Sequence, residues 1–166
     1  LASLEGFLFP DTYEFTPGTA PVTIIETMVK RYREVQARVD AAGVTAGNHT
    51  PYQRLILASI VEKEAKTPAE RPLVASVFYN RLKLGRRLES CATVLYALGF
   101  HKNDLSLQDL KISSPYNTYL VLALPPTPIC SPGEPSLAAA ARPMATKYLY
   151  FVSRNDGTHE FTATLE

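Results

Sequence analysis

A glutamate at the end of an apolar helix stripe is the first candidate for chemistry in this chain. In the segment 55–65, apolar residues recur at Leu57, Ile60 and Val61, the spacing of one helix face. Seven residues after Leu57, that face reaches Glu64. Because burial disfavours the charged form of a carboxyl group, Glu64 should hold its proton more tightly than an exposed glutamate. Such a group suits general acid catalysis, although a solvent-facing residue at a helix end shows the same pattern.

A second glutamate, Glu62, lies on another face of the same predicted helix. It precedes Lys66 by four residues, in the order that favours an ion pair on a helix surface. We therefore expect Glu62 to be exposed and paired with Lys66, with no part in the chemistry.

Composition limits the remaining classes of function. The chain has 166 residues, 46% hydrophobic and 20% charged, which suits one globular domain with a core. Its net charge of +1 gives no electrostatic case for binding nucleic acid or an anionic membrane surface. No apolar run reaches transmembrane length and no signal peptide opens the chain. Because Leu1 is not a methionine, we expect an excised domain, and we give no weight to Leu165 and Glu166.

Metal and cofactor binding find no support in the sequence. Neither the two cysteines nor the three histidines have the spacing of zinc ligands, and we predict no cofactor. These residues are Cys91, Cys130, His49, His101 and His159.

Periodicity and turn signals predict a single helix-rich α+β domain over residues 1–166, with a β-hairpin at its C-terminal end. Thr67 and Glu70 have the spacing of a capping box. The prolines of 124–133 require extended chain. A β-prone segment, 148–152, precedes the hairpin signal Asp156-Gly157. The predicted elements are helices from Pro21 to near Gly43, over the segment 55–65 that Pro51 precedes, from about Pro68 to Leu84 and from Pro135 to Ala141, with a return strand His159–Thr162.

Several short motifs together resemble one family over nearly the whole chain. In the same order, they are similar to the catalytic domain of the YceG-like family, the endolytic murein transglycosylases. The motifs are Leu4–Tyr13, Ala58–Glu64, Glu70-Arg71, Val74–Leu82, Ser114–Tyr119, Leu124–Pro126, Ser131–Gly133, Tyr148–Val152, Gly157 and His159.

The resemblance implies an enzyme of the bacterial envelope. Family members lie on the extracytoplasmic face of the cytoplasmic membrane, held by an N-terminal helix that a LysM-like region follows; we expect both segments to lie outside this chain. They cut nascent peptidoglycan strands between N-acetylmuramic acid and N-acetylglucosamine and leave 1,6-anhydro-N-acetylmuramic ends. Peptidoglycan synthases are plausible partners. The second glutamate of the family's Glu-Lys-Glu motif is catalytic and corresponds to Glu64.

The resemblance also suggests substrate-binding residues. Tyr116, Asn117 and Thr118 offer donors and acceptors for sugar hydroxyl and acetamido groups. The alternative is a turn in which these side chains hydrogen-bond their own backbone.

One carboxyl group suffices for this reaction. Glycosidases use two carboxyl groups, but here the C6 hydroxyl of the muramic residue attacks C1, so no water needs activation. Two other functions stay open: a non-catalytic glycan-binding or scaffold domain, and a hydrolytic muramidase.

The chain departs from the family at one motif. Many members have Ser-Asp-Pro-Thr where this chain has Ser90-Cys91-Ala92-Thr93, so a role of that aspartate does not transfer. Cys91 and Cys130 both lie near the expected substrate side of an extracytoplasmic protein. We therefore predict a disulfide between them.

Overall fold

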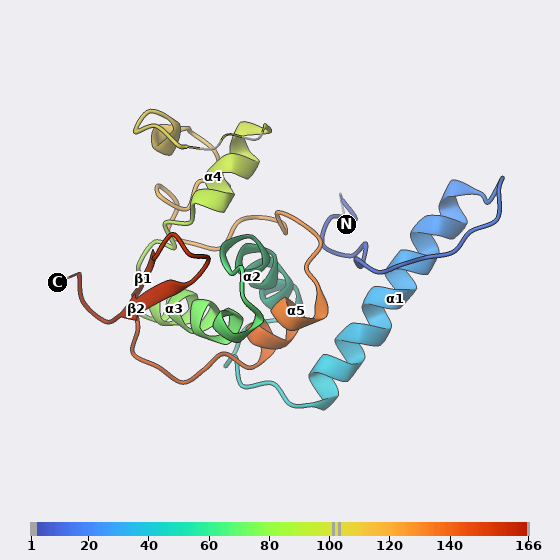
Figure 1. Ribbon diagram of the computed structural model, residues 1–166, viewed down its shortest axis with the longest axis horizontal. Coiled ribbons are helices and arrows are strands. Elements are labelled where there is room, and N and C mark those ends of the chain that lie inside the picture. The colour runs from blue at the N-terminus through green and yellow to red at the C-terminus, as the bar shows by residue number, and fades with distance from the viewer. Residues whose placement is uncertain (1–2, 101, 103, 166) are drawn as a thin grey trace.

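The computed structural model describes residues 3–100, 102 and 104–165, so Leu1, His101 and Glu166 lie outside the described residues. Figure 1 shows a helical body with a hairpin at one side and a small lobe around α4. The helix-rich α+β fold with a C-terminal hairpin is confirmed. The elements are α1 (Pro21–Ala41), α2 (Pro51–Glu64), η1 (Pro68–Glu70), α3 (Arg71–Lys83), α4 (Cys91–Leu98), η2 (Asp109–Lys111), α5 (Glu134–Ala141), β1 (Tyr150–Ser153) and β2 (His159–Thr162).

Helix α2 forms the centre of the body, between α3 and α5 (Figure 1). Every residue from Leu55 to Val61 is buried, so this helix is enclosed all round until its last turn. Thr50 and Gln53 form a capping box at its start, which fixes where it begins. The capping box expected at Thr67 and Glu70 is wrong: Thr67 makes no capping bond, and the Glu70 carboxylate binds His159 instead.

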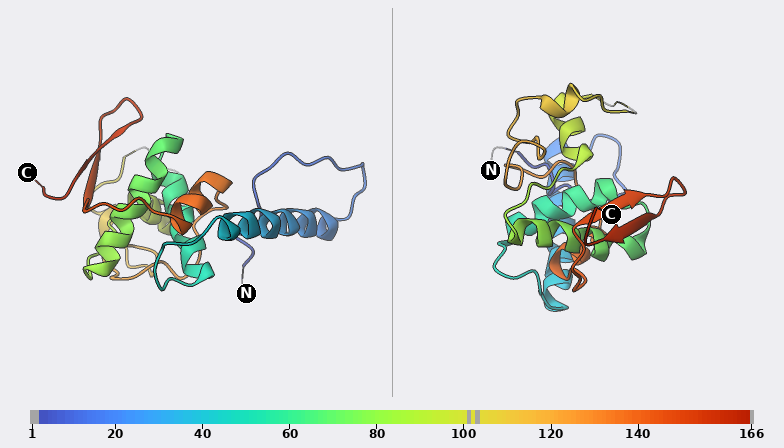
Figure 2. Two further views of the ribbon diagram at one scale, coloured as in Figure 1. Left: turned by 90° about the horizontal axis from the view of Figure 1, so that it is seen from below. Right: turned by 90° about the vertical axis from the view of Figure 1, so that its left-hand side faces the viewer.

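Helix α1 meets this body near its C-terminal end, where it contacts α5, and its N-terminal part extends away from the body (Figure 2). It buries Tyr32, Val35 and Val39 on one face. The aromatic segment near the N-terminus packs on it, with Phe7 5.2 Å from Tyr32 between ring centroids. No helix in the described part of the chain is both long and apolar enough to cross a membrane.

The second strand of the hairpin spans His159–Thr162, as predicted, and its register sets Tyr150 opposite Thr162 and Ser153 opposite His159. It is fixed to α3 in two ways. The Phe151 ring packs edge-on against Phe78 at 5.8 Å, and the Asn80 amide donates to the carbonyls of Thr146 and Tyr148. These contacts place β1 beside the end of α2.

Candidate active site

Glu64 is the last residue of α2 and lines a pocket of about 320 Å³. Five regions meet there: the end of α2, the second half of α3, the segment that leads into α4, the turn 114–119, and strand β1 with residues that flank the hairpin. The pocket is lined by Glu64, Val77, Arg81, Leu88, Glu89, Cys91, Tyr119, Leu149, Tyr150, Phe151, Val152 and Leu165.

The Glu64 carboxyl group is desolvated yet hydrogen-bonded. Burial, the largest effect, raises the pKa of Glu64 above its ordinary value of 4.5. The hydroxyl of Ser90 donates to Oε1 at 2.5 Å and the backbone N–H of Ala92 also donates, and both bonds oppose the rise in pKa. The desolvation predicted from the helix face is confirmed. Such a group can hold a proton and is still stabilised after it has given the proton away.

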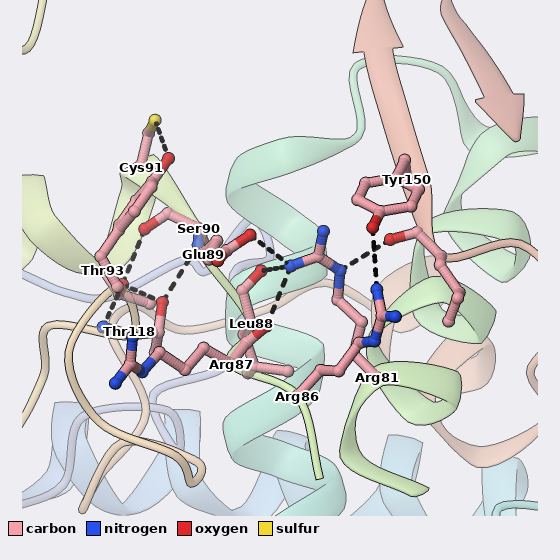
Figure 3. A network of polar contacts seen from close by, with 12 residues as sticks. Arg81, Arg86, Arg87, Leu88, Glu89, Ser90, Cys91, Thr93, Thr118 and Tyr150 are labelled. Carbon is pink, nitrogen blue, oxygen red and sulfur yellow. Dashed lines mark hydrogen bonds and ion pairs between the residues drawn. The ribbon is translucent and has the colours of Figure 1, made fainter. Parts of the chain in front are cut away.

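Ser90 is held in place by two buried threonines. Its backbone N–H donates to Thr118 Oγ1 at 3.0 Å, and Thr93 Oγ1 donates to its carbonyl at 2.7 Å. The two threonine hydroxyls share a further bond of 2.8 Å, and neither residue has exposed surface. Figure 3 shows this set beside Cys91. The Ser90 hydroxyl is therefore preorganised by backbone and side-chain bonds.

Arg81 fixes the segment before Ser90. Arg81 is 7% exposed; its guanidinium donates to the carbonyls of Arg87, Leu88 and Leu149 and pairs with the Glu89 carboxylate at 2.7 Å (Figure 3). Glu89 has a φ of 55°, in the left-handed region that residues other than glycine rarely adopt. The arginine thus holds a strained residue immediately before the one that contacts Glu64.

The structure separates the three predicted substrate-binding residues from the Glu64 pocket. Asn117 has no exposed surface; its amide donates to the carbonyls of Leu110 and Ile112, and its side-chain oxygen accepts from the Tyr119 N–H. These bonds match the alternative of a turn that caps its own backbone. Thr118 does not line the pocket; it accepts bonds from the backbone N–H groups of Ser90 and Glu89.

Tyr116 is half-buried, and its hydroxyl contacts Thr127 Oγ1 at 2.8 Å. Its ring lies 4.8 Å from that of Tyr96, outside the lining of the Glu64 pocket. Contact of Tyr116 with substrate stays a prediction.

Tyr119 and Cys91 line the Glu64 pocket. The sequence analysis expected Cys91 near the substrate side but gave Tyr119 no role. The Tyr119 hydroxyl and Cys91 Sγ are 3.2 Å apart. Burial raises the pKa of the Tyr119 phenol, and the bond to Cys91 adds to the rise. The phenol of Tyr119 in the turn 114–119 was a visible signal for this place, and Ser90 stands in a motif that the resemblance had put on the substrate side. Nothing in the sequence marked Arg81 as a neighbour of the site.

The predicted Cys91–Cys130 disulfide is wrong, because both cysteines are free. Cys91 begins α4 and faces Tyr119, whereas the Cys130 thiol donates to the Ser59 carbonyl of α2 at 3.2 Å. Burial raises the pKa of Cys130 to about 12. The two cysteine side chains therefore contact different residues, Tyr119 and Ser59.

The expected Glu62–Lys66 pair is also replaced by other contacts. Glu62 accepts bonds from Ser136 Oγ at 2.5 Å and the Gly133 N–H at 3.3 Å, and its carboxylate lies 3.8 Å from the Arg71 guanidinium. The physical reason is that α5 packs against this face of α2, so the face is not a free surface.

Glu70 and His159 join η1 to β2. The Glu70 carboxylate accepts from the His159 backbone N–H at 2.8 Å and lies 2.9 Å from Nδ1. Both side chains are nearly buried, and the His159 ring lowers the pKa of Glu64 as a minor effect.

Across residues 3–100, 102 and 104–165, no group of three or more His, Cys, Asp or Glu side chains has a metal-binding arrangement.

Comparison with known proteins decides the family. The model of the YceG-like family matches residues 1–166. The chain belongs to the YceG-like family. A crystal structure of a YceG-like protein from Listeria monocytogenes has a TM-score of 0.89 and 41% identity, over 98% of this chain and 53% of that chain.

Two relatives are named endolytic murein transglycosylase. The Bacillus subtilis protein is 42% identical over 164 residues, covering 98% of this chain and 45% of that protein. A Streptococcus pneumoniae protein is 34% identical over 155 residues, covering 90% of this chain and 28% of its own length. The chain thus spans less than half the length of either relative.

Proposed function

We propose that this chain is an endolytic peptidoglycan lytic transglycosylase, with Glu64 as its single acid–base group. The observation that carries the proposal is a desolvated carboxyl group, with two hydrogen-bond donors, at the wall of a pocket. Two YceG-like relatives bear the name of this activity.

The first step uses the protonated form of Glu64. The carboxyl group donates its proton to the glycosidic oxygen between N-acetylmuramic acid and N-acetylglucosamine, and the C1–O bond breaks as positive charge develops at C1. The raised pKa keeps more of Glu64 protonated than an exposed glutamate would be. As the carboxylate forms, the Ser90 hydroxyl and the Ala92 N–H donate to it.

The second step returns the proton. The C6 hydroxyl of the muramic residue attacks C1, the Glu64 carboxylate takes the hydroxyl proton, and a 1,6-anhydro ring closes. Because the nucleophile belongs to the substrate, its attack gains from proximity and no second catalytic carboxyl group is required. Glu64 ends in its starting form, so atoms and protons balance without an added reactant.

A hydrolytic muramidase is the alternative that one observation favours. Glu89 lines the same pocket, and hydrolytic glycosidases use two carboxyl groups. Its carboxylate, however, is held by Arg81 at 2.7 Å. That ion pair gives Glu89 a structural task in the loop before Ser90, which is why we prefer the transglycosylase.

The cellular setting is part of the same proposal. We place the domain on the extracytoplasmic face of the cytoplasmic membrane, anchored by a segment outside this chain, with peptidoglycan strands as substrate and peptidoglycan synthases as partners. Membership of the YceG-like family is the support for this setting.

Product mass tests the proposed activity. Purified, uncross-linked glycan strands are incubated with the protein, and the new chain ends are weighed. We expect muramic ends lighter by one water than reducing ends. Reducing ends would identify a muramidase, and unchanged strands would identify a binding or scaffold domain.

A further inference from the structure

A second pocket continues the candidate site away from Glu64. It has a volume of about 450 Å³ and shares Arg81, Glu89 and Tyr150 with the Glu64 pocket. Shared walls make the two pockets one groove. The second part is closed by the residues after α3, including Arg86 and Arg87.

The walls of this second part carry excess positive charge. Arg86 and Arg87 are both exposed, and ion pairs to them are absent among residues 3–100, 102 and 104–165. Glu89 is the carboxylate that lines this pocket, and Arg81 neutralises it. The two remaining guanidinium groups therefore set the sign of the local field.

Tyr150 adds an aromatic wall and holds one arginine. Its hydroxyl accepts from Arg86 Nη1 at 2.8 Å, and the Arg81 guanidinium lies 5.0 Å from its ring centre. Figure 3 shows Arg86 turned toward Tyr150 and Arg87 extending in the opposite direction. A ligand along this part of the groove would meet the Arg86 guanidinium beside the Tyr150 ring at one end and the Arg87 guanidinium at the other. Each guanidinium is suited to a carboxylate that a sugar carries.

We propose that Arg86 and Arg87 form a carboxylate subsite for the muramic residues of the substrate. The inference rests on the proposed function, because it assigns the substrate group that this part of the groove takes. Each muramic residue carries a lactyl ether that ends in a carboxylate, or in a stem peptide that bears carboxylates. N-acetylglucosamine carries neither group, so the subsite distinguishes the two alternating sugars.

The subsite explains how the correct bond reaches Glu64. A strand shifted by one sugar would present the wrong glycosidic oxygen to the acid and leave the two arginines without a carboxylate. Arginine recognises carboxylates by paired N–H donors, so this contact fixes register as well as affinity. Arg86 and Arg87 are positioning residues that act on binding, while the proton transfers belong to Glu64.

Binding measurements in a Glu64→Gln background test the subsite without catalysis. Three ligands are compared: uncross-linked strands with stem peptides, strands whose peptides an amidase has removed, and chitin oligosaccharides without carboxylates. The variant is Arg86→Gln with Arg87→Gln. The matched control is Lys83→Gln, which removes an exposed charge at the end of α3 outside the groove lining.

We expect the double variant to bind at least one muramic ligand about tenfold more weakly, with chitin oligosaccharides unchanged. Loss confined to peptide-bearing strands identifies a stem carboxylate, loss confined to stripped strands identifies the lactyl carboxylate, and loss on both shows that the subsite takes either. Lys83→Gln should change none of the three affinities.

Equal affinity of the double variant and its parent for both muramic ligands would overturn the subsite, as would an equal loss for chitin oligosaccharides. Because Arg86 contacts the hairpin through Tyr150, Arg87→Gln alone serves as the second variant, and its melting temperature should match that of the parent. A failed product-mass test would refute the transglycosylase separately, since the binding comparison needs no turnover.

Discussion

The two glutamates at the end of α2, Glu62 and Glu64, are two residues apart in the chain and lie in different surroundings. Glu62 faces the start of α5, where Ser136, Gly133 and Arg71 surround its carboxylate. Glu64 faces the pocket, where its neighbours are the Ser90 hydroxyl and the Ala92 N–H. One carboxylate joins two helices, and the other is placed against the space that a substrate can enter.

The difference lies in the charge that each face supplies. Beside Glu62 stands a cation and two donors, a set that stabilises a permanent carboxylate. The two donors that contact the Glu64 carboxylate are neutral, and burial outweighs them and the smaller effect of His159, so the pKa of Glu64 is raised. Two residues of the same type on one helix thus acquire different chemistry from their neighbours.

The largest effect should come from Glu64→Gln. A glutamine keeps the shape and hydrogen bonds but cannot donate and recover a proton. Because one group serves both steps, we predict a loss of about 10⁴-fold or more in strand cleavage. Release of anhydro-muramic ends measures the loss, and circular dichroism checks that the variant is folded. Cleavage within about tenfold of wild type would remove Glu64 from the chemistry.

Ser90→Ala should slow strand cleavage less than Glu64→Gln does, because it acts on the surroundings of Glu64. It removes the hydroxyl that stabilises the Glu64 carboxylate, so we predict about tenfold slower cleavage. The pKa of Glu64 should rise further, which moves the alkaline limb of the pH–rate profile to higher pH. An unmoved alkaline limb would show that this bond does not act on Glu64.

Glu62→Gln should change stability instead of chemistry. The substitution weakens the contacts to Ser136, Gly133 and Arg71, and we predict a loss of about 1 kcal/mol in the free energy of unfolding. Cleavage per folded molecule should stay within about twofold of wild type, since a residue outside the site leaves the barrier unchanged. Urea unfolding and a rate corrected for the folded fraction separate the two effects.

The smallest effect is the pH dependence of stability. A raised pKa in the folded state means that Glu64 favours folding fully below its unfolded pKa of about 4.5 and loses that contribution as pH rises through the folded pKa. Compared with Glu64→Gln, the wild type should therefore melt relatively lower at pH 8 than at pH 4. Thermal melts of both proteins check the sign, and a pH-independent difference would contradict the raised pKa.

The secondary-structure elements and the desolvation of Glu64 could be predicted, because each depends on local sequence. The stripe through Leu57, Ile60 and Val61 located Glu64, and Asp156-Gly157 located the hairpin. The turn signal and the β-prone segment before it also sufficed to predict the return strand, which spans His159–Thr162.

Partners across the fold could not be predicted, because they depend on which faces pack together. Glu62 was assigned to Lys66 since nothing in the sequence placed α5 against that face. Arg81 lies near the end of α3, yet it is buried and binds three carbonyls that lie outside that helix, which no local pattern indicates. The turn at Asn117 offered polar groups that suited a sugar or its own backbone, and only its burial shows which groups it binds.

The central claim is that only one of these two carboxyl groups does the chemistry. The most direct test compares the strand-cleavage rates of Glu62→Gln and Glu64→Gln, per folded molecule and on the same uncross-linked strands, as a ratio of the first rate to the second. Release of anhydro-muramic ends is the signal. We predict a ratio of about 10⁴ or more, with Glu62→Gln close to wild type. A ratio near one, or a dead Glu62→Gln beside an active Glu64→Gln, would contradict the assignment of the acid.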